Sequence, residues 1–142
     1  MTTQSLPQTR QAVDTLLELI AAARAGEAAH LYAADALLDA TVPGCRFQKR
    51  GPAAIAAVWA SWFDAPGSFE ELDRVPTPDG EVVRYLVASV DEGGAFAAHH
   101  CHLLTFDDVS GLVVRHQVWC GGRWHADRRQ EMAEAQRREP SA

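Results

Sequence analysis

Three histidines on two neighbouring predicted strands are the side chains best suited to acid–base chemistry in this sequence. His100 and His102 lie on the first strand, and His116 lies on the second. A neutral imidazole has an ordinary pKa near 6.5, so it can take up and return protons at physiological pH. Asp39, on an earlier strand, could orient one of these rings or act as a base itself; its alternation with Leu38 and Ala40 offers the alternative that it points to the outer face. Such a set predicts either proton transfer in a pocket or a buried polar network bridged by water.

The two strands that carry the histidines form a predicted β-hairpin. Apolar runs at residues 95–106 and 112–120 flank the polar turn Asp-Asp-Val-Ser-Gly. A regular turn places His102 opposite His116, and side chains alternate between the two faces along each strand. The more apolar face should look toward the helices and comprises Ala98, His100, His102, Leu104, Phe106, Leu112, Val114, His116, Val118 and Cys120. The opposite face, with Cys101 and Trp119, is the predicted outer surface.

Helices precede this hairpin in the sequence. Apolar residues at helical spacing predict the helices, and β-type runs bounded by Pro and Gly predict the strands. The predicted helices cover residues 11–24 and 27–33 and a third that begins at Pro52, and the strands cover 36–42, 68–75, 81–91 and the hairpin. Helices ahead of an antiparallel sheet indicate an α+β fold, with a curved sheet wrapped around a long helix. The domain should span 11–124, between a flexible tail (1–10) and a charged C-terminal helix or tail (125–142).

An apolar pocket is expected between the histidine face and the helix that begins at Pro52. Aromatic side chains of that helix would cover a flat or greasy ligand, and apolar residues of the hairpin would complete the wall. The expected ligand-binding residues are Trp59, Phe63, Leu104, Val118 and Cys120. The ligand would be a small apolar or aromatic organic molecule.

Arg84 is the predicted polar contact on the strand before the hairpin. A regular turn at Gly93-Gly94 places it opposite His102, where it could bind an anionic substrate or an oxyanion. An unpaired arginine is costly to bury, so a one-residue slip that turns Tyr85 inward is the competing prediction.

Composition excludes several classes of function. The chain has 142 residues, enough for one domain with its own core, and a net charge of −6, which argues against binding to nucleic acid or anionic membranes. No apolar segment approaches 18 residues, so no membrane span is expected. Three cysteines without C-x-x-C spacing suit reduced thiols in the cytoplasm.

The order of elements resembles the cone-shaped nuclear transport factor 2-like superfamily, in particular its SnoaL-like members. The resemblance rests on residues 31–39 (Leu-Tyr-Ala-Ala-Asp-Ala-Leu-Leu-Asp), 50–55 and 110–119. It implies a deep apolar pocket inside the cone and a homodimer formed through the outer face of the sheet. The catalytic groups of ketosteroid isomerase would fall at Ala40, Leu19 and His102, so its carboxylate chemistry is missing.

Three hypotheses follow for function. In the first, the protein is a lyase, cyclase or isomerase without a cofactor, in which His102 and His116 transfer protons, His100 orients them or the substrate, and Arg84 steadies negative charge. In the second, the same pocket only holds a ligand, as in a binding or accessory module. In the third, the three histidines bind a metal such as zinc, although no acidic residue shares their face.

Overall fold

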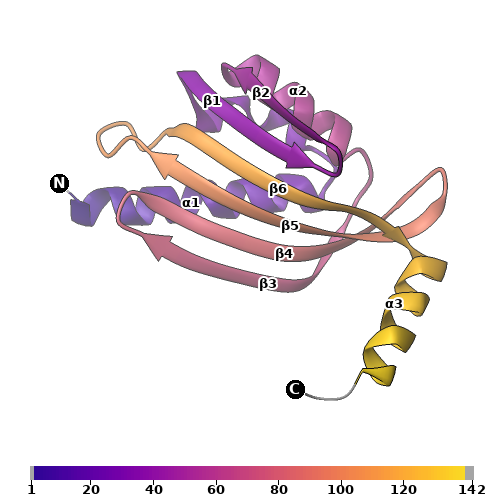
Figure 1. Cartoon of the computed structure of the whole chain (residues 1–142). Coiled ribbons are helices and arrows are strands. Elements are labelled where there is room, and N and C mark those ends of the chain that lie inside the picture. The colour runs from indigo at the N-terminus through magenta and orange to yellow at the C-terminus, as the bar shows by residue number, and fades with distance from the viewer. Residues whose placement is uncertain (1, 140–142) are drawn as a thin grey trace.

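Six strands form one open sheet in the computed structural model, which describes residues 2–139 and their side chains from residue 10 onward. The elements are α1 (Thr2–Ala21), the 3-10 helix η1 (Ala25–Leu31), β1 (Tyr32–Val42), β2 (Cys45–Arg50), α2 (Pro52–Trp62), β3 (Ser68–Thr77), β4 (Gly80–Asp91), β5 (Gly94–Phe106), β6 (Val113–His125) and α3 (Ala126–Arg138). The strand order is β2-β1-β6-β5-β4-β3 (Figure 1). Neighbouring strands are antiparallel except β1 and β6, which are parallel. The structure confirms the predicted α+β fold.

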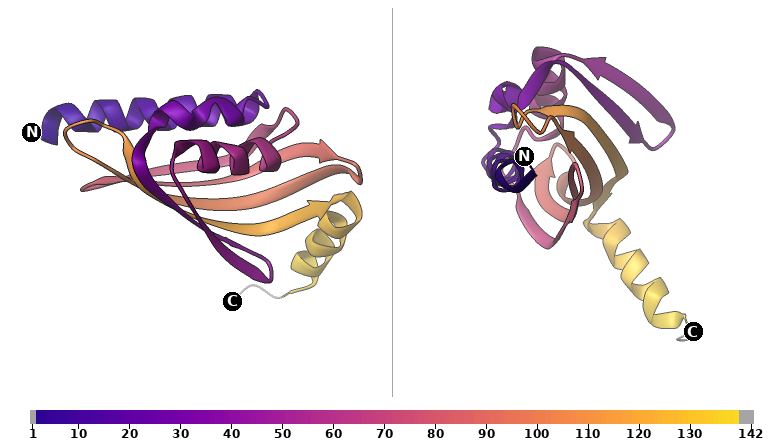
Figure 2. Two further views of the ribbon diagram at one scale, coloured as in Figure 1. Left: turned by 90° about the horizontal axis from the view of Figure 1, so that it is seen from above. Right: turned by 90° about the vertical axis from the view of Figure 1, so that its left-hand side faces the viewer.

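The sheet curves around the helices, so that α1 and α2 cover its concave face (Figure 2). Helix α1 buries one stripe at helical spacing, with Val13 and Ile20 each 1% exposed. Helix α2 inserts Ile55 and Trp59, which are completely buried. Burying each large apolar side chain contributes roughly 1.5–3 kcal/mol. The core therefore lies between these helices and the inner face of β1, β4, β5 and β6.

The β5–β6 hairpin has a different register from the predicted one, but its three inner histidines lie on the predicted face. His102 opposes Val118, and His116 opposes Leu104, a shift of two positions along the strand. Side chains alternate with a period of two, so an even shift leaves each residue on its own face. His100, His102 and His116 are all buried on the helix side, as predicted.

Two irregularities interrupt this hairpin. Near the turn, Phe106 pairs with Val113, which is 2% exposed and takes the inner position predicted for Leu112 and Val114. At the other end the predicted strand stops at residue 120, whereas β6 continues through a bulge to His125. Gly122 has φ +94, a conformation that costs glycine little, so the chain can bend there without ending the sheet.

The outlying parts of the chain also differ from prediction. Residues 45–50, which were not predicted as a strand, form β2, which pairs with β1 at one edge of the sheet. Residues 2–10, predicted as a flexible tail, belong to α1, and residue 1 lies outside the described residues. Helix α3 projects from the body and buries no residue (Figures 1 and 2). Within residues 2–139, no helix is long and apolar enough to cross a membrane.

Arg74 on β3 ties α1 to the sheet. It is paired with Glu81 on β4 and Asp14 on α1, and its Nη2 donates to the Arg10 carbonyl at 3.0 Å. The side chains of Arg74 and Glu81 are 14% and 3% exposed, whereas that of Asp14 is 52% exposed. Arg74 therefore forms a largely buried ion pair with Glu81 inside the sheet, and it reaches α1 through the exposed Asp14 carboxylate and the Arg10 carbonyl.

Replacing Arg74 with alanine should lower the free energy of unfolding by about 3–5 kcal/mol, because the Glu81 carboxylate stays buried without a counter-charge. Urea denaturation at neutral pH measures this change. The matched control, Asp14→Asn, removes only the exposed partner and should cost about 1 kcal/mol or less. Equal losses in the two variants would show that the buried Arg74–Glu81 pair contributes no more to stability than the exposed contact with Asp14.

Candidate functional site

A continuous chain of hydrogen bonds runs between α2 and the sheet. Its six members come from α2 and from strands β1, β4, β5 and β6, and we name them the histidine–tyrosine chain. In order, they are Trp59, Tyr32, His116, His102, Tyr85 and His100. The chain therefore draws both tyrosines of the protein and half of its histidines into one buried network.

The inner half of the histidine–tyrosine chain begins at Trp59 on α2. Trp59 Nε1 donates to Tyr32 Oη at 2.9 Å, and the same oxygen lies 2.8 Å from His116 Nδ1. His116 Nε2 then lies 2.7 Å from His102 Nδ1. The parallel pairing of β1 with β6 brings Tyr32 and His116 together across 84 positions of sequence.

The outer half of the histidine–tyrosine chain is bridged by Tyr85. Its hydroxyl oxygen lies 2.9 Å from His102 Nε2 and 2.9 Å from His100 Nδ1. Tyr85 faces inward because the β4–β5 turn pairs it with His100. The structure therefore confirms the competing prediction for this strand, in which a one-residue slip turns Tyr85 inward.

Burial holds all titratable members of the chain in their neutral forms. His116, His102 and His100 are 0%, 2% and 5% exposed. Burial lowers the pKa of His100 to about 4, with smaller contributions from His99 and Arg123, and lowers the pKa of His116 to about 3. It also lowers the pKa of His102 well below its ordinary value, and the neighbouring imidazoles add to this effect. Burial raises the pKa of both tyrosines.

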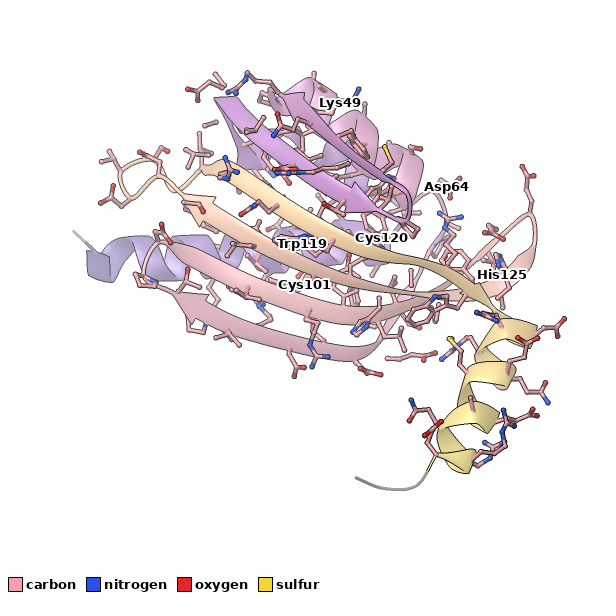
Figure 3. The ribbon with its side chains drawn as sticks, viewed as in Figure 1. Lys49, Asp64, Cys101, Trp119, Cys120 and His125 are labelled. Carbon is pink, nitrogen blue, oxygen red and sulfur yellow. The ribbon has the colours of Figure 1, made fainter. Side chains whose placement is uncertain are left out.

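The outer end of the histidine–tyrosine chain opens into a cavity of about 230 Å³, which we name the His100 cavity. Its walls are mainly apolar and come from α1, α2 and the inner face of the sheet. They include Ile20, Trp62, Phe63, Val87, Phe96 and Ala98, with His100, Ser89, Cys120, Asp64 and Arg123 as polar neighbours. Figure 3 labels two of these polar neighbours, Asp64 and Cys120. The volume suits a ligand about the size of one substituted ring.

His100 presents one ring nitrogen to this cavity. Its Nδ1 is bound to Tyr85, while no side chain or backbone group of the described residues binds its Nε2. Among those residues, His99 Nε2 is the one fully buried side-chain nitrogen or oxygen without a partner. His100 Nε2 is therefore accessible from the cavity that His100 lines.

The structure divides the predicted ligand-binding residues into two groups. Phe63 and Cys120 line the His100 cavity. Trp59 and Val118 are completely buried and Leu104 is 2% exposed, and none of the three lines this cavity. They pack the core beneath it instead, and Trp59 also anchors the inner end of the histidine–tyrosine chain.

Arg84 lies on the outer face of the sheet, which corrects its predicted position opposite His102. It pairs with Cys101 across the β4–β5 ladder and forms an ion pair with Asp73 on β3. The turn Asp91–Gly94 shifts this ladder by one residue, and an odd shift reverses the faces. Arg84 therefore does not contact the three buried histidines.

Asp39 also faces away from the histidines. Arg46 binds its carboxylate through two hydrogen bonds of 2.9 and 2.6 Å, and Arg115 Nη2 lies 3.9 Å away. These bonds from Arg46 lower the pKa of Asp39 below its ordinary value. Asp39 is thus held as a carboxylate on the outer face, the alternative that its alternation predicted, and it does not orient a histidine or act as their base.

Two residues of the site, Tyr32 and Arg123, were not singled out from the sequence, and Tyr85 was named only in the competing prediction for its strand. Tyr32 and Tyr85 supply the hydroxyls that join the histidines, and Arg123 borders the cavity with its guanidinium 4.3 Å from the Phe96 ring. A usable signal was present for the tyrosines. Buried imidazoles need partners, and the only tyrosines of the chain stand on strands next to the histidine strands.

The geometry does not favour metal binding by the histidines. His102 Nδ1 and His116 Nε2 are bonded to each other at 2.7 Å, and their other ring nitrogens are bonded to tyrosine hydroxyls. In the part of the chain that the structure describes, no group of three or more His, Cys, Asp or Glu side chains is placed to hold a metal ion. The imidazoles serve one another as hydrogen-bond partners.

The outer face of the sheet carries large exposed side chains. Trp119 on β6 and Leu72 on β3 are each 43% exposed. Trp119 pairs with Cys101 on β5, and the two lie side by side (Figure 3). Exposed aromatic groups of this kind suit a protein interface, and a homodimer through this face remains a prediction.

Comparison with known proteins supports the fold. No family model matches the sequence, and neither does any curated protein. A Bacillus subtilis protein provisionally named an isomerase is similar in structure, with a TM-score of 0.67, 12% identity and coverage of 82% of this chain and 88% of its own. A Xanthomonas campestris pv. campestris protein provisionally named a polyketide cyclase has a TM-score of 0.64, 16% identity and coverage of 81% and 91%.

An NTF2-like protein from Anabaena variabilis is similar to the same degree. Its TM-score is 0.67 at 10% identity, and the alignment covers 83% of this chain and 90% of that one. At such identities a structural likeness shows the fold and not the activity. The chain has the nuclear transport factor 2-like fold, as its sequence predicted.

Proposed function

We propose that this protein binds a small, largely apolar organic molecule in the His100 cavity and acts on it as a lyase, cyclase or isomerase without a cofactor. The observation that carries this proposal is the position of His100 Nε2, at the open end of a buried hydrogen-bond chain and next to an apolar wall. The provisional isomerase and cyclase names of two structurally similar proteins point to the same class of reaction.

The roles of the histidines in this proposal differ from those expected from the sequence. His100 is the group that contacts the ligand and exchanges a proton with it. His102 and His116 have no access to the cavity and act through His100, so they are positioning residues. A positioned acid or base of this kind contributes typically 10²–10⁴-fold to a rate.

The second candidate is a binding module that uses the same cavity without chemistry. The low pKa of His100, about 4, favours this alternative, because such an imidazole is a weak base at neutral pH. Of the residues that line the cavity, only Asp64 is a carboxylate, and it is exposed. A ligand would then be held by apolar contacts and one hydrogen bond to His100.

His100→Gln should separate the two candidates. The purified protein is incubated with a panel of small cyclic ketones and phenols. Binding is followed by ligand-observed NMR, and conversion is followed by liquid chromatography with mass spectrometry. For a compound that the protein converts, we expect the variant to lose at least about 100-fold in turnover while binding changes much less.

His99→Gln is the matched control. His99 is the neighbouring residue of β5 and lies on the other face of the strand, against Trp124. This variant should retain turnover. Full turnover in His100→Gln would contradict the catalytic role of His100. Saturable binding without conversion of any bound compound would favour the binding module.

A further inference from the structure

Trp59 sets the direction of the histidine–tyrosine chain from its inner end. Its indole N–H can only donate, so the Tyr32 oxygen accepts at 2.9 Å. The single hydroxyl proton of Tyr32 then needs an acceptor, and His116 Nδ1 at 2.8 Å is the one that the described residues provide. If His116 Nδ1 were instead the donor to the Tyr32 oxygen, the buried hydroxyl proton of Tyr32 would have no acceptor, which destabilises that arrangement. Tyr32 is therefore the donor to His116.

Each later bond follows from the previous one. A neutral imidazole carries one proton, so His116, which accepts at Nδ1, donates from Nε2 to His102 Nδ1 at 2.7 Å. By the same rule, His102 donates from Nε2 to the Tyr85 oxygen at 2.9 Å. The hydroxyl of Tyr85 then donates to His100 Nδ1 at 2.9 Å. The remaining proton of His100 must lie on Nε2, the nitrogen accessible from the cavity.

The neutral state of the rings is consistent with this assignment. A protonated imidazole would donate from both nitrogens, and at every position of the chain one of these donors would face the donor of a neighbour. Burial already disfavours the charged form of all three rings. The five hydrogen bonds therefore have one consistent direction with one proton in each.

We infer that the histidine–tyrosine chain has a single resting polarity, which presents an N–H donor at His100 Nε2 and selects ligands that offer an accepting oxygen, of which a ketone is the simplest. The selection of ligands rests on the proposed function, whereas the polarity does not. A neutral imidazole that donates to a carbonyl oxygen polarises that carbonyl, so His100 would meet its ligand first as an electrophilic donor and not as a base.

The polarity is tested on the ligand-free, full-length protein with ¹⁵N-labelled histidine at pH 7. Long-range ¹H–¹⁵N correlation spectra distinguish a nitrogen that carries a proton from one that does not. We expect protonated Nε2 and unprotonated Nδ1 in His100, His102 and His116. A proton on Nδ1 in any of the three, or a charged ring, would overturn the assigned direction. This measurement needs no substitution and therefore does not depend on the folding of a variant.

The ligand class is tested with two probes of nearly equal shape, acetophenone and α-methylstyrene, which differ in a carbonyl oxygen and a methylene group. The hydrocarbon is the more apolar, so nonspecific burial would favour it. We expect acetophenone to bind the wild-type protein at least ten-fold more tightly in ligand-observed NMR. His100→Phe should lose this preference, and His99→Gln should retain it.

The outcomes separate this inference from the proposed function. Reversed tautomers together with tight, saturable ketone binding would overturn the polarity and leave the proposed function standing. The expected tautomers with binding of neither probe would overturn the ligand class and the use of the cavity together. An unchanged preference in His100→Phe would show that the carbonyl is recognised by another group, and would also overturn the ligand class.

Discussion

Tyr85→Phe should be among the most destabilising single-atom changes in this protein. Removing the hydroxyl leaves two buried groups without a partner, the donor His102 Nε2 and the acceptor His100 Nδ1. Each unsatisfied buried group costs roughly 1–3 kcal/mol, so the free energy of unfolding should fall by about 2–6 kcal/mol. Urea denaturation measures it, as a lower midpoint with an unchanged slope against denaturant.

Ser89→Ala provides the comparison on the same strand. Its hydroxyl donates to the carbonyl of the exposed Pro66 at 2.8 Å from a half-buried position, so its removal should cost about 1 kcal/mol. Tyr85→Phe should also weaken ligand binding, because His100 loses the contact that orients its ring. Equal stability losses in the two variants would mean that the Tyr85 hydroxyl does not bridge the histidines.

Mild acid should unfold this protein through its buried histidines. In the unfolded chain they take up protons near pH 6.5, whereas the folded-state pKa values of His100 and His116 are about 4 and about 3, and that of His102 is also lowered. Between pH 6.5 and the folded-state pKa values, the unfolded state binds more protons than the folded state, so the free energy of unfolding falls as the pH falls. Three such groups can lower the free energy of unfolding by up to about 4 kcal/mol per pH unit.

The pH window separates this effect from that of the carboxylates. Asp39 and Asp91 have pKa values below their ordinary 3.8, mainly through bonds from Arg46 and His125, so their stabilising contributions are lost only at lower pH. Urea denaturation at several pH values should show constant stability above about pH 7, then a steep fall toward pH 4. Equal stability at pH 7 and pH 5 would contradict neutral burial of the histidines.

The positions of Arg84 and Tyr85 show that a register error of one residue is enough to exchange the two faces of a predicted strand. Both residues lie on a strand that was predicted correctly, and its partner strand was also correct. The turn between Asp91 and Gly94 shifts the β4–β5 register by one residue from the register that a regular turn at Gly93-Gly94 predicts. In β5–β6 the register differs by two residues from the predicted one, and the three histidines stay on the predicted face. Parity of the register, more than its value, decides which side chains are buried.

Local sequence pattern by itself determined the α+β class, the hairpin and the common face of His100, His102 and His116, because alternation along a strand depends only on neighbouring residues. Tertiary structure alone decided which histidine reaches the cavity. Tyr32 meets His116 only through the parallel pairing of β1 with β6, and Trp59 reaches Tyr32 only because α2 packs across the sheet. Such long-range contacts leave no periodic signal in the sequence, yet they turn three aligned histidines into a directed chain that ends at the cavity.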